Sequence, residues 1–153
     1  MNDAAPESVI FGENHLSIED VLAVAERRAP VRLQADERFR QHIARGAQFL
    51  DTLLDREGVI YGVTTGYGDS CVVAVPLSQV EALPQHLFTF HGCGLGKLLD
   101  AEATRAVLAA RLRSLTHGMS GVRIELLERM QAFLEHDILP LIPEEGSVGA
   151  SGD

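Results

Sequence analysis

The residues best suited to chemistry form a run of small side chains at 149–153, Gly-Ala-Ser-Gly-Asp. Alanine and glycine leave the backbone poorly shielded here, so the amide nitrogen of Gly152 could attack the carbonyl carbon of Ala150 and close a five-membered ring. Loss of two waters would then turn Ser151 into an exocyclic methylene, an electrophile that no unmodified side chain supplies. A glycine- and serine-rich loop that caps a helix has the same composition, so the run alone leaves both interpretations open.

A second candidate is Tyr61, which opens the glycine-rich sequence Tyr-Gly-Val-Thr-Thr-Gly-Tyr-Gly at 61–68. We predict a short strand at 59–63 leading into a turn-rich segment at 64–70, which would place the phenol rigidly beside a loop. A phenol ionises near pH ~10, so a tyrosine that acts as a base needs positive charge nearby. The alternative is a packed tyrosine with a hydrogen-bonded hydroxyl.

His91, at a predicted helix end, could likewise meet a ligand or only cap the helix.

Other polar patterns argue against a metal or nucleotide cofactor. The two cysteines, Cys71 and Cys93, have neither CxxC nor Cys/His metal spacing, and the remaining histidines are scattered along the chain. The glycine-rich run at 92–97 matches neither common phosphate-binding pattern, and it follows a predicted helix instead of a strand. We therefore predict no metal site and no nucleotide.

The composition predicts a globular protein with a small-molecule ligand. The chain has 153 residues, of which 46% are hydrophobic, and a formal net charge of −9. This charge argues against nucleic-acid and anionic-membrane partners, which it would repel. The first 13 residues lack the basic and apolar regions of a signal peptide, and no run of about 18 apolar residues occurs. We therefore predict a cytoplasmic protein.

Helical periodicity dominates the elements that must position these residues. Ser17, Asp36, Ser78 and Asp100 are candidate N-caps, and glycines or prolines follow the apolar runs. We predict helices at 18–28, 36–56, 78–91, 101–116 and 122–137, and brief strands at 31–33 and 59–63. Pro84 implies a kink or a late start in the third helix. The predicted fold class is mainly α.

Three stretches in order resemble the aromatic amino acid ammonia-lyases, which comprise histidine, phenylalanine and tyrosine ammonia-lyases and related aminomutases. They are YGVTTGYG at 61–68, HGCGLG at 91–96 and GSVGASGD at 146–153, and the segment at 111–122 also looks like the family's helix-turn-helix. The resemblance spans roughly residues 17–153. It implies an L-aspartase-like helical fold in which residues 1–153 form the amino-terminal third, with a long helical bundle expected after Asp153.

The resemblance also implies a reaction. In the family, Ala-Ser-Gly cyclises into 4-methylidene-imidazol-5-one (MIO), which assigns this role to Ala150, Ser151 and Gly152. The tyrosine of the YGxxTGxG loop is the family's base, which implies that Tyr61 removes a β-proton while ammonia leaves an aromatic amino acid. Phe90 and His91 align with the pair that faces the substrate side chain, and Gly68 is expected at the substrate. A homotetramer with shared active sites is implied.

The substrate is less sharply indicated. Phenylalanine lyases commonly have Phe-Leu at the pair, many tyrosine lyases His-Leu and histidine lyases Ser-His, so Phe90-His91 is a hybrid. The sequence Thr-Thr-Gly-Tyr at 64–67 departs from the Asn-Thr-Gly-Phe of histidine lyases and looks closer to lyases associated with aryl-polyene pigments. We predict tyrosine, with histidine or phenylalanine as alternatives. A 2,3-aminomutase, or a catalytically silent assembly module, is also compatible, and the 153-residue chain alone is expected to be inactive.

Overall fold

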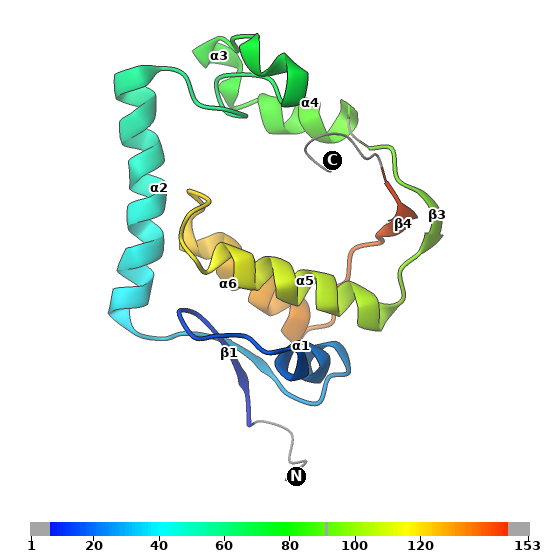
Figure 1. Cartoon of the computed structure of the whole chain (residues 1–153). Coiled ribbons are helices and arrows are strands. Elements are labelled where there is room, and N and C mark those ends of the chain that lie inside the picture. Colours follow the sequence, from blue (N-terminus) through cyan, green and yellow to red (C-terminus); the bar gives the residue numbers. More distant parts are fainter. Residues whose placement is uncertain (1–6, 91, 147–153) are drawn as a thin grey trace. The chain divides into compact units, whose positions relative to one another are not determined.

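A computed structural model of the chain describes residues 7–90 and 92–146 (Figure 1). The chain divides into two compact units. The first unit comprises Met1–Phe49 and Leu99–Ile142, and the second comprises Leu50–Leu98 and Pro143–Asp153. The described elements are mostly helices with a few short strands, which confirms the predicted fold class.

The first unit is built on a hydrophobic core between short helices. It contains β1 (Val9–Phe11), α1 (Ile18–Ala25), β2 (Val31–Leu33), the first part of α2 (Glu37–Glu57), α5 (Ala101–Leu115) and α6 (Ile124–Glu135). β1 and β2 pair in parallel, with Val9 opposite Val31, and α5 packs against both α1 and α6. The largest fully buried hydrophobic side chains are Phe11, Phe39, Ile43, Leu112, Leu115 and Leu127. Burial of each such side chain contributes about 1.5–3 kcal/mol.

The predicted helix starts at Ser17, Asp36 and Asp100 are confirmed. Ser17 and Asp20 form a capping box, in which each side chain accepts a hydrogen bond from the other residue's backbone N–H. Asp36 accepts from the backbone N–H of Phe39 at 2.9 Å, and Asp100 from that of Ala103 at 2.8 Å. These bonds satisfy amide groups that the first turn of a helix leaves without an intrahelical partner.

The carboxyl ends of α1 and α6 are joined by charged side chains. Arg27 and Asp137 follow the two helices with φ of 59° and 55°, a region that few residues other than glycine adopt. Arg27 Nη1 lies 3.1 Å from Asp137 Oδ2, and Arg105 Nη1 lies 2.8 Å from Asp137 Oδ1. Arg105 Nε also donates to the carbonyl of Ala25 at 2.5 Å. One carboxylate thus links the ends of α1 and α6 to α5.

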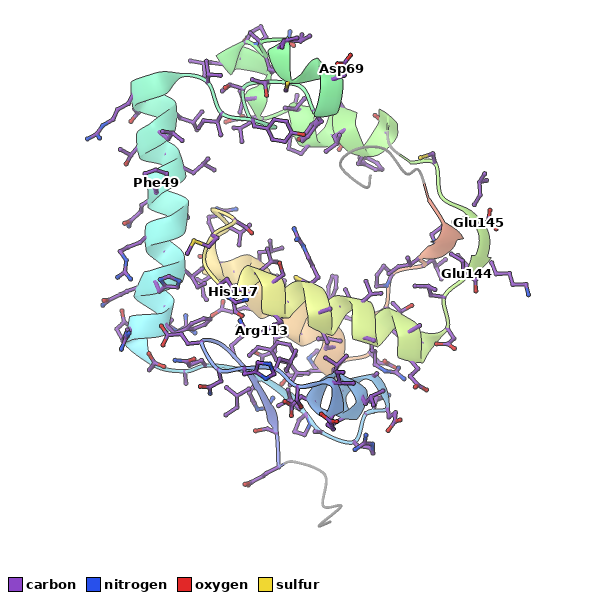
Figure 2. The ribbon with its side chains drawn as sticks, in the orientation of Figure 1. Phe49, Asp69, Arg113, His117, Glu144 and Glu145 are labelled. Atoms are coloured by element: carbon purple, nitrogen blue, oxygen red, sulfur yellow. The ribbon has the colours of Figure 1, made fainter. Side chains whose placement is uncertain are left out.

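The end of α5 is held by a second group of hydrogen bonds, in the region of Arg113 and His117 labelled in Figure 2. Arg113 Nη1 donates to the carbonyl of Gly12 at 3.1 Å, and His42 Nε2 lies 2.9 Å from the carbonyl oxygen of His117. Gly118 follows with φ of 71°, and a Cβ at this position would lie 2.6 Å from His42 Nε2. A glycine is therefore required at the turn that ends α5.

The second unit contains short elements around a long loop. They are the last part of α2, the 3₁₀ helix η1 (Gly68–Val72), α3 (Leu77–Val80), α4 (Leu83–Phe90), β3 (Leu95–Leu98) and β4 (Pro143–Glu145). β3 and β4 pair antiparallel, with Leu95 opposite Glu145 and Leu98 opposite Pro143. Gly58 follows α2 with φ of 65°, as expected for a glycine that ends a helix.

Several predicted elements are wrong. Residues 61–64 form a turn instead of a strand, because the amides of Val63 and Thr64 both donate to the carbonyl of Ile60. The predicted helix at 78–91 is divided into α3 and α4, and its first N-cap is Pro76 instead of Ser78. Pro84 occupies the first turn of α4, where a missing N–H costs nothing. β1, β3 and β4 were not predicted.

Candidate active site

Two buried threonines shape the turn that carries Tyr61. The hydroxyl of Thr64 accepts a hydrogen bond from the backbone N–H of Ile60 at 2.7 Å. The hydroxyl of Thr65 accepts from the N–H of Gly62 at 3.1 Å and donates to the carbonyl of Gly66 at 2.9 Å. Both side chains are buried, so these bonds satisfy backbone groups that water does not reach easily.

The loop then returns on itself. Thr65 and Ala74 form an isolated antiparallel bridge, the N–H of Gly66 donates to the carbonyl of Val73, and the N–H of Val75 donates to that of Thr64. The 3₁₀ helix η1 lies between these paired segments. The backbone from residue 64 to residue 75 is therefore fixed at both ends, with Tyr67 and Gly68 inside the closed segment.

The hydroxyl of each tyrosine is hydrogen-bonded to the backbone of the glycine that follows the other tyrosine. We call this arrangement the tyrosine clasp (Tyr61, Gly62, Tyr67 and Gly68). The hydroxyl oxygen of Tyr61 accepts from the backbone N–H of Gly68 at 2.9 Å, and the hydroxyl of Tyr67 donates to the carbonyl of Gly62 at 2.9 Å. The ring centroids are 6.2 Å apart with an interplanar angle of 82°, a favourable edge-to-face geometry. Each tyrosine thus bonds the residue that follows the other.

Both glycines of the tyrosine clasp have left-handed backbones, with φ of 70° at Gly62 and 56° at Gly68. A Cβ on Gly62 would also lie 2.8 Å from Cε1 of Tyr67, which means that the Tyr67 ring lies directly against this glycine. Glycine is required there both for the backbone conformation and for the space.

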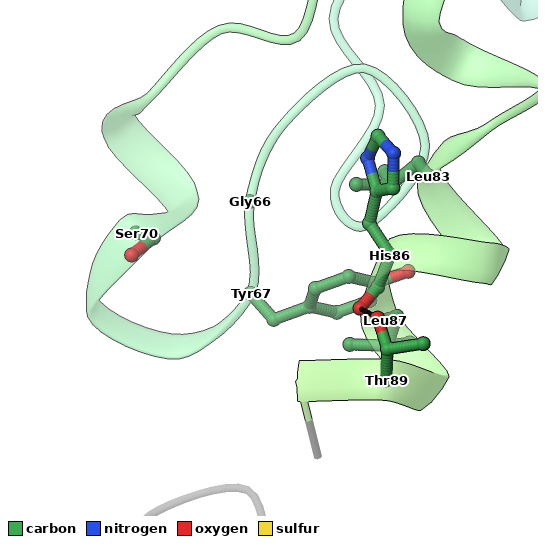
Figure 3. A pocket seen from close by; sticks show the side chains of 7 residues that line it. All are labelled: Gly66, Tyr67, Ser70, Leu83, His86, Leu87 and Thr89. Carbon is green, nitrogen blue, oxygen red and sulfur yellow. Dashed lines mark hydrogen bonds between the residues drawn. The ribbon is translucent and has the colours of Figure 1, made fainter. Parts of the chain in front are cut away.

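A cavity of about 560 Å³ lies beside the tyrosine clasp, within the second unit. Gly66, Tyr67 and Ser70 line it from the loop, and Leu83, His86, Leu87 and Thr89 line it from α4 (Figure 3). The Tyr67 side chain points from the loop toward α4, and the hydroxyl of Thr89 donates to the carbonyl of His86 at 2.8 Å. The volume falls in the range of small-molecule sites.

The predicted site residues are only partly within the described structure. Tyr61 lies in the turn with 58% of its surface exposed, and its hydroxyl meets Gly68. Phe90 is the last residue of α4. His91 and the three residues Ala150, Ser151 and Gly152 lie outside the described residues. Among the described residues, no group of three or more His, Cys, Asp or Glu side chains could hold a metal ion.

Sequence reasoning missed the part that Tyr67 and His86 play. In the sequence, Tyr67 stands out only as a departure from a family pattern, and His86 is one of several histidines scattered along the chain. The repeated Tyr-Gly pair, at 61–62 and 67–68, was a signal that could have indicated the reciprocal contact.

No helix in the described part of the chain combines the length and apolar character needed to span a membrane.

Comparison with known proteins assigns the family. A family model described as aromatic amino acid lyase matches residues 16–153. The chain therefore belongs to the aromatic amino acid lyase family, whose members are carbon–nitrogen ammonia-lyases and use the MIO group.

Three relatives show the range of activities. The chain is 41% identical to histidine ammonia-lyase from Symbiobacterium thermophilum over 147 residues, which are 96% of this chain and 28% of that protein. It resembles tyrosine aminomutase from Streptomyces globisporus with 35% identity and a TM-score of 0.85, over 92% of this chain and 26% of that one. It also resembles phenylalanine ammonia-lyase from the yeast Rhodosporidium toruloides, with 26% identity, a TM-score of 0.76, and coverage of 98% and 22%. The chain thus spans less than a third of these relatives.

Proposed function

We propose that this chain provides the tyrosine loop of an MIO-dependent ammonia-lyase, which removes ammonia from an aromatic L-amino acid and leaves an α,β-unsaturated acid. The observation that carries the proposal is that Tyr61 is 58% exposed while its hydroxyl oxygen accepts a hydrogen bond from the backbone N–H of Gly68 at 2.9 Å. A base must be reachable by the proton that it removes, and its position must be fixed. Tyr61 combines the two properties.

The geometry suggests how Tyr61 would act. A phenol must carry negative charge to accept a β-proton, and an N–H that already points at its oxygen would stabilise that charge. Gly68 supplies this N–H from the loop's own backbone. The edge contact with Tyr67 and the buried hydroxyls of Thr64 and Thr65 limit movement of the turn. The base would therefore be oriented before the substrate binds.

The sequence at 150–152 fits the prosthetic group, because Ala, Ser and Gly are the three residues whose cyclisation and loss of two waters would give MIO. This group supplies an electrophile for the substrate's amino group, which makes nitrogen a better leaving group. We expect the intact protein to be lighter than its sequence by two waters, and Ser151→Ala to restore the unmodified mass. An unmodified mass in both proteins would contradict the proposal.

Tyrosine is the substrate that we propose first, because Thr64 and Tyr67 depart from the Asn-Thr-Gly-Phe pattern of histidine lyases. The 41% identity to a histidine ammonia-lyase and the likeness to a phenylalanine ammonia-lyase keep histidine and phenylalanine as alternatives. We expect the full-length protein to release an absorbing acrylate from one of the three amino acids without added cofactor. Tyr61→Phe should abolish this release. Absence of product with all three would overturn the proposal.

A second candidate is a 2,3-aminomutase, which is favoured by the TM-score of 0.85 to tyrosine aminomutase. An aminomutase would use the same residues but retain the acrylate until ammonia returns at the β-carbon. Chiral analysis of the products for a β-amino acid separates the two reactions. A third candidate is a catalytically silent assembly module. Turnover by the 153-residue chain alone would exclude it.

We also propose that the protein works in the cytoplasm as a homotetramer with shared active sites. Light scattering after size-exclusion chromatography would measure the mass of the assembly. Mixing an inactive Tyr61→Phe protein with an inactive Ser151→Ala protein would test sharing, because restored activity requires the two residues to come from different subunits.

A further inference from the structure

The tyrosine clasp holds its two rings unequally. Tyr61 is more than half exposed, whereas Tyr67 is partly buried and lies directly against the α-carbon of Gly62. The Tyr67 ring also borders the cavity toward α4, where Leu83 and Leu87 provide apolar side chains (Figure 3). The more buried ring can act as the support, and the exposed ring is the one presented to a ligand.

The hydroxyl of Tyr67 acts at the residue next to Tyr61. Its bond to the carbonyl of Gly62, at 2.9 Å, holds the Gly62–Val63 peptide, which begins one residue after Tyr61, and the ring meets Tyr61 edge-on with ring centroids 6.2 Å apart. The amide of Gly68, directly after Tyr67, holds the Tyr61 oxygen at 2.9 Å. Displacing Tyr67 would therefore disturb the backbone, the ring and the oxygen of Tyr61 together.

We propose that Tyr67 is a positioning residue for Tyr61, and that its ring and its hydroxyl both contribute to the orientation of the Tyr61 phenol. The proposal rests on the proposed function only for its effect on catalysis, because the contact between the two tyrosines is a property of the loop itself. The hydroxyl of Tyr67 fixes the turn, and its ring limits the angle of the Tyr61 side chain.

The composition allows a direct structural test. The chain has two tyrosines and no tryptophan, so tyrosine labelled with ¹³C at Cζ gives two resonances, both from the tyrosine clasp. The variants Tyr61→Phe and Tyr67→Phe assign them. We expect the Tyr61 resonance to move toward its position in the unfolded chain in Tyr67→Phe, and further in Tyr67→Leu. An unchanged Tyr61 resonance in both variants would overturn the proposal.

Kinetics of the full-length protein give the second readout. We expect Tyr67→Phe to lower kcat about tenfold and Tyr67→Leu about 100-fold, with KM within about twofold, because the displaced base affects the chemical step more than binding. Tyr67→Phe should be more active than Tyr67→Leu because it retains the aromatic ring that contacts Tyr61. A loss in KM alone, or equal kcat for all three proteins, would contradict a positioning role.

A matched control is Val72→Ala, in the same loop, because the Val72 side chain is 86% exposed. It should change neither the Tyr61 resonance nor kcat.

The experiments distinguish a failure of the proposed function, in which Tyr61 is the base, from a failure of the positioning role proposed for Tyr67. If Tyr61→Phe keeps full activity, the proposed base is wrong, and the resonance still decides whether Tyr67 orients Tyr61. If Tyr61→Phe is inactive but Tyr67→Leu is fully active, the positioning role alone is wrong.

Discussion

The two units of the chain are stabilised in different ways. The buried hydrophobic side chains of the described structure, from Val9 to Leu134, all belong to the first unit. In the second unit, the only described side chains that are buried are those of Thr64 and Thr65. The first unit is thus held by a hydrophobic core, whereas the tyrosine loop is held by hydrogen bonds.

This difference has energetic consequences. A buried hydrophobic side chain contributes about 1.5–3 kcal/mol, whereas a typical hydrogen bond contributes about 0.5–1.5 kcal/mol net. The loop that carries Tyr61 therefore has the smaller reserve of stability, and local opening there should be easier than global unfolding. The geometry of the loop therefore depends on a small number of polar contacts.

The largest expected effect is in the core of the first unit. Phe39 has no exposed surface, so Phe39→Ala should lower the free energy of unfolding by about 3–5 kcal/mol through lost burial and a cavity. Urea denaturation of the 153-residue chain measures the change. Phe88→Ala in the second unit is the matched control, because its side chain is 64% exposed, and it should change stability by about 0.5 kcal/mol or less. Equal losses would contradict the contrast between the units.

A smaller effect is expected for Thr64→Val, which keeps the shape of the side chain but removes its hydroxyl. The amide of Ile60 would lose its acceptor at 2.7 Å, which should cost about 1–3 kcal/mol because the group is shielded from water. We expect faster hydrogen exchange at the Ile60 amide. Thr89→Val, which changes an exposed hydroxyl on α4, should leave that exchange rate unchanged. Unaltered exchange in both proteins would show that the loop does not depend on the Thr64 bond.

Asp137 allows backbone strain to be separated from ion pairing in the first unit. Asp137→Ala and Asp137→Gly both remove the bonds to Arg27 and Arg105, but only glycine adopts a φ of 55° without strain. We expect alanine to lower the free energy of unfolding by about 1–2 kcal/mol, with glycine about 1 kcal/mol less damaging. Arg105, whose side chain is 11% exposed, is the partner to remove in a double-mutant cycle. Equal stability of the two variants would mean that no strain is stored there.

Local signals in the sequence predicted much of the helical fold. The caps at Ser17, Asp36 and Asp100 were found because a capping side chain and its amide partner are only a few residues apart. The strand at 59–63 was wrong because the β-branched Val59 and Ile60 suggested extension, whereas the positive φ of Gly62 and the bonds to the Ile60 carbonyl impose a turn. β1 was missed because it is stabilised by pairing with β2, a contact between segments that are distant in the sequence and that local signals do not encode.

The candidate site was predicted only in part for the same reason. The sequence predicted Tyr61 in a strand directly before the turn-rich segment that contains Gly68, and the structure brings the Tyr61 hydroxyl to the Gly68 amide. The bond from Tyr67 to the Gly62 carbonyl was not predictable, because it depends on side-chain directions within an irregular turn. Neither a hydrophobic period nor a propensity encodes those directions. The roles of Ala150, Ser151 and Gly152 remain predictions from the family pattern.

The smallest expected effect is a pH dependence at the start of α2. The side chain of Gln34 and the backbone N–H of Phe39 both donate to Asp36 and lower the pKa of this carboxyl below its ordinary value of 3.8. A folded pKa below the unfolded value means that the stabilisation is fully present above pH 3.8 and is lost as the pH falls through the lowered pKa. Asp36→Asn should keep the cap but remove this dependence, as measured by thermal unfolding between neutral and acidic pH. If the wild-type chain and Asp36→Asn lose the same stability as the pH falls, other carboxylates, and not the cap of α2, govern acid unfolding of the first unit.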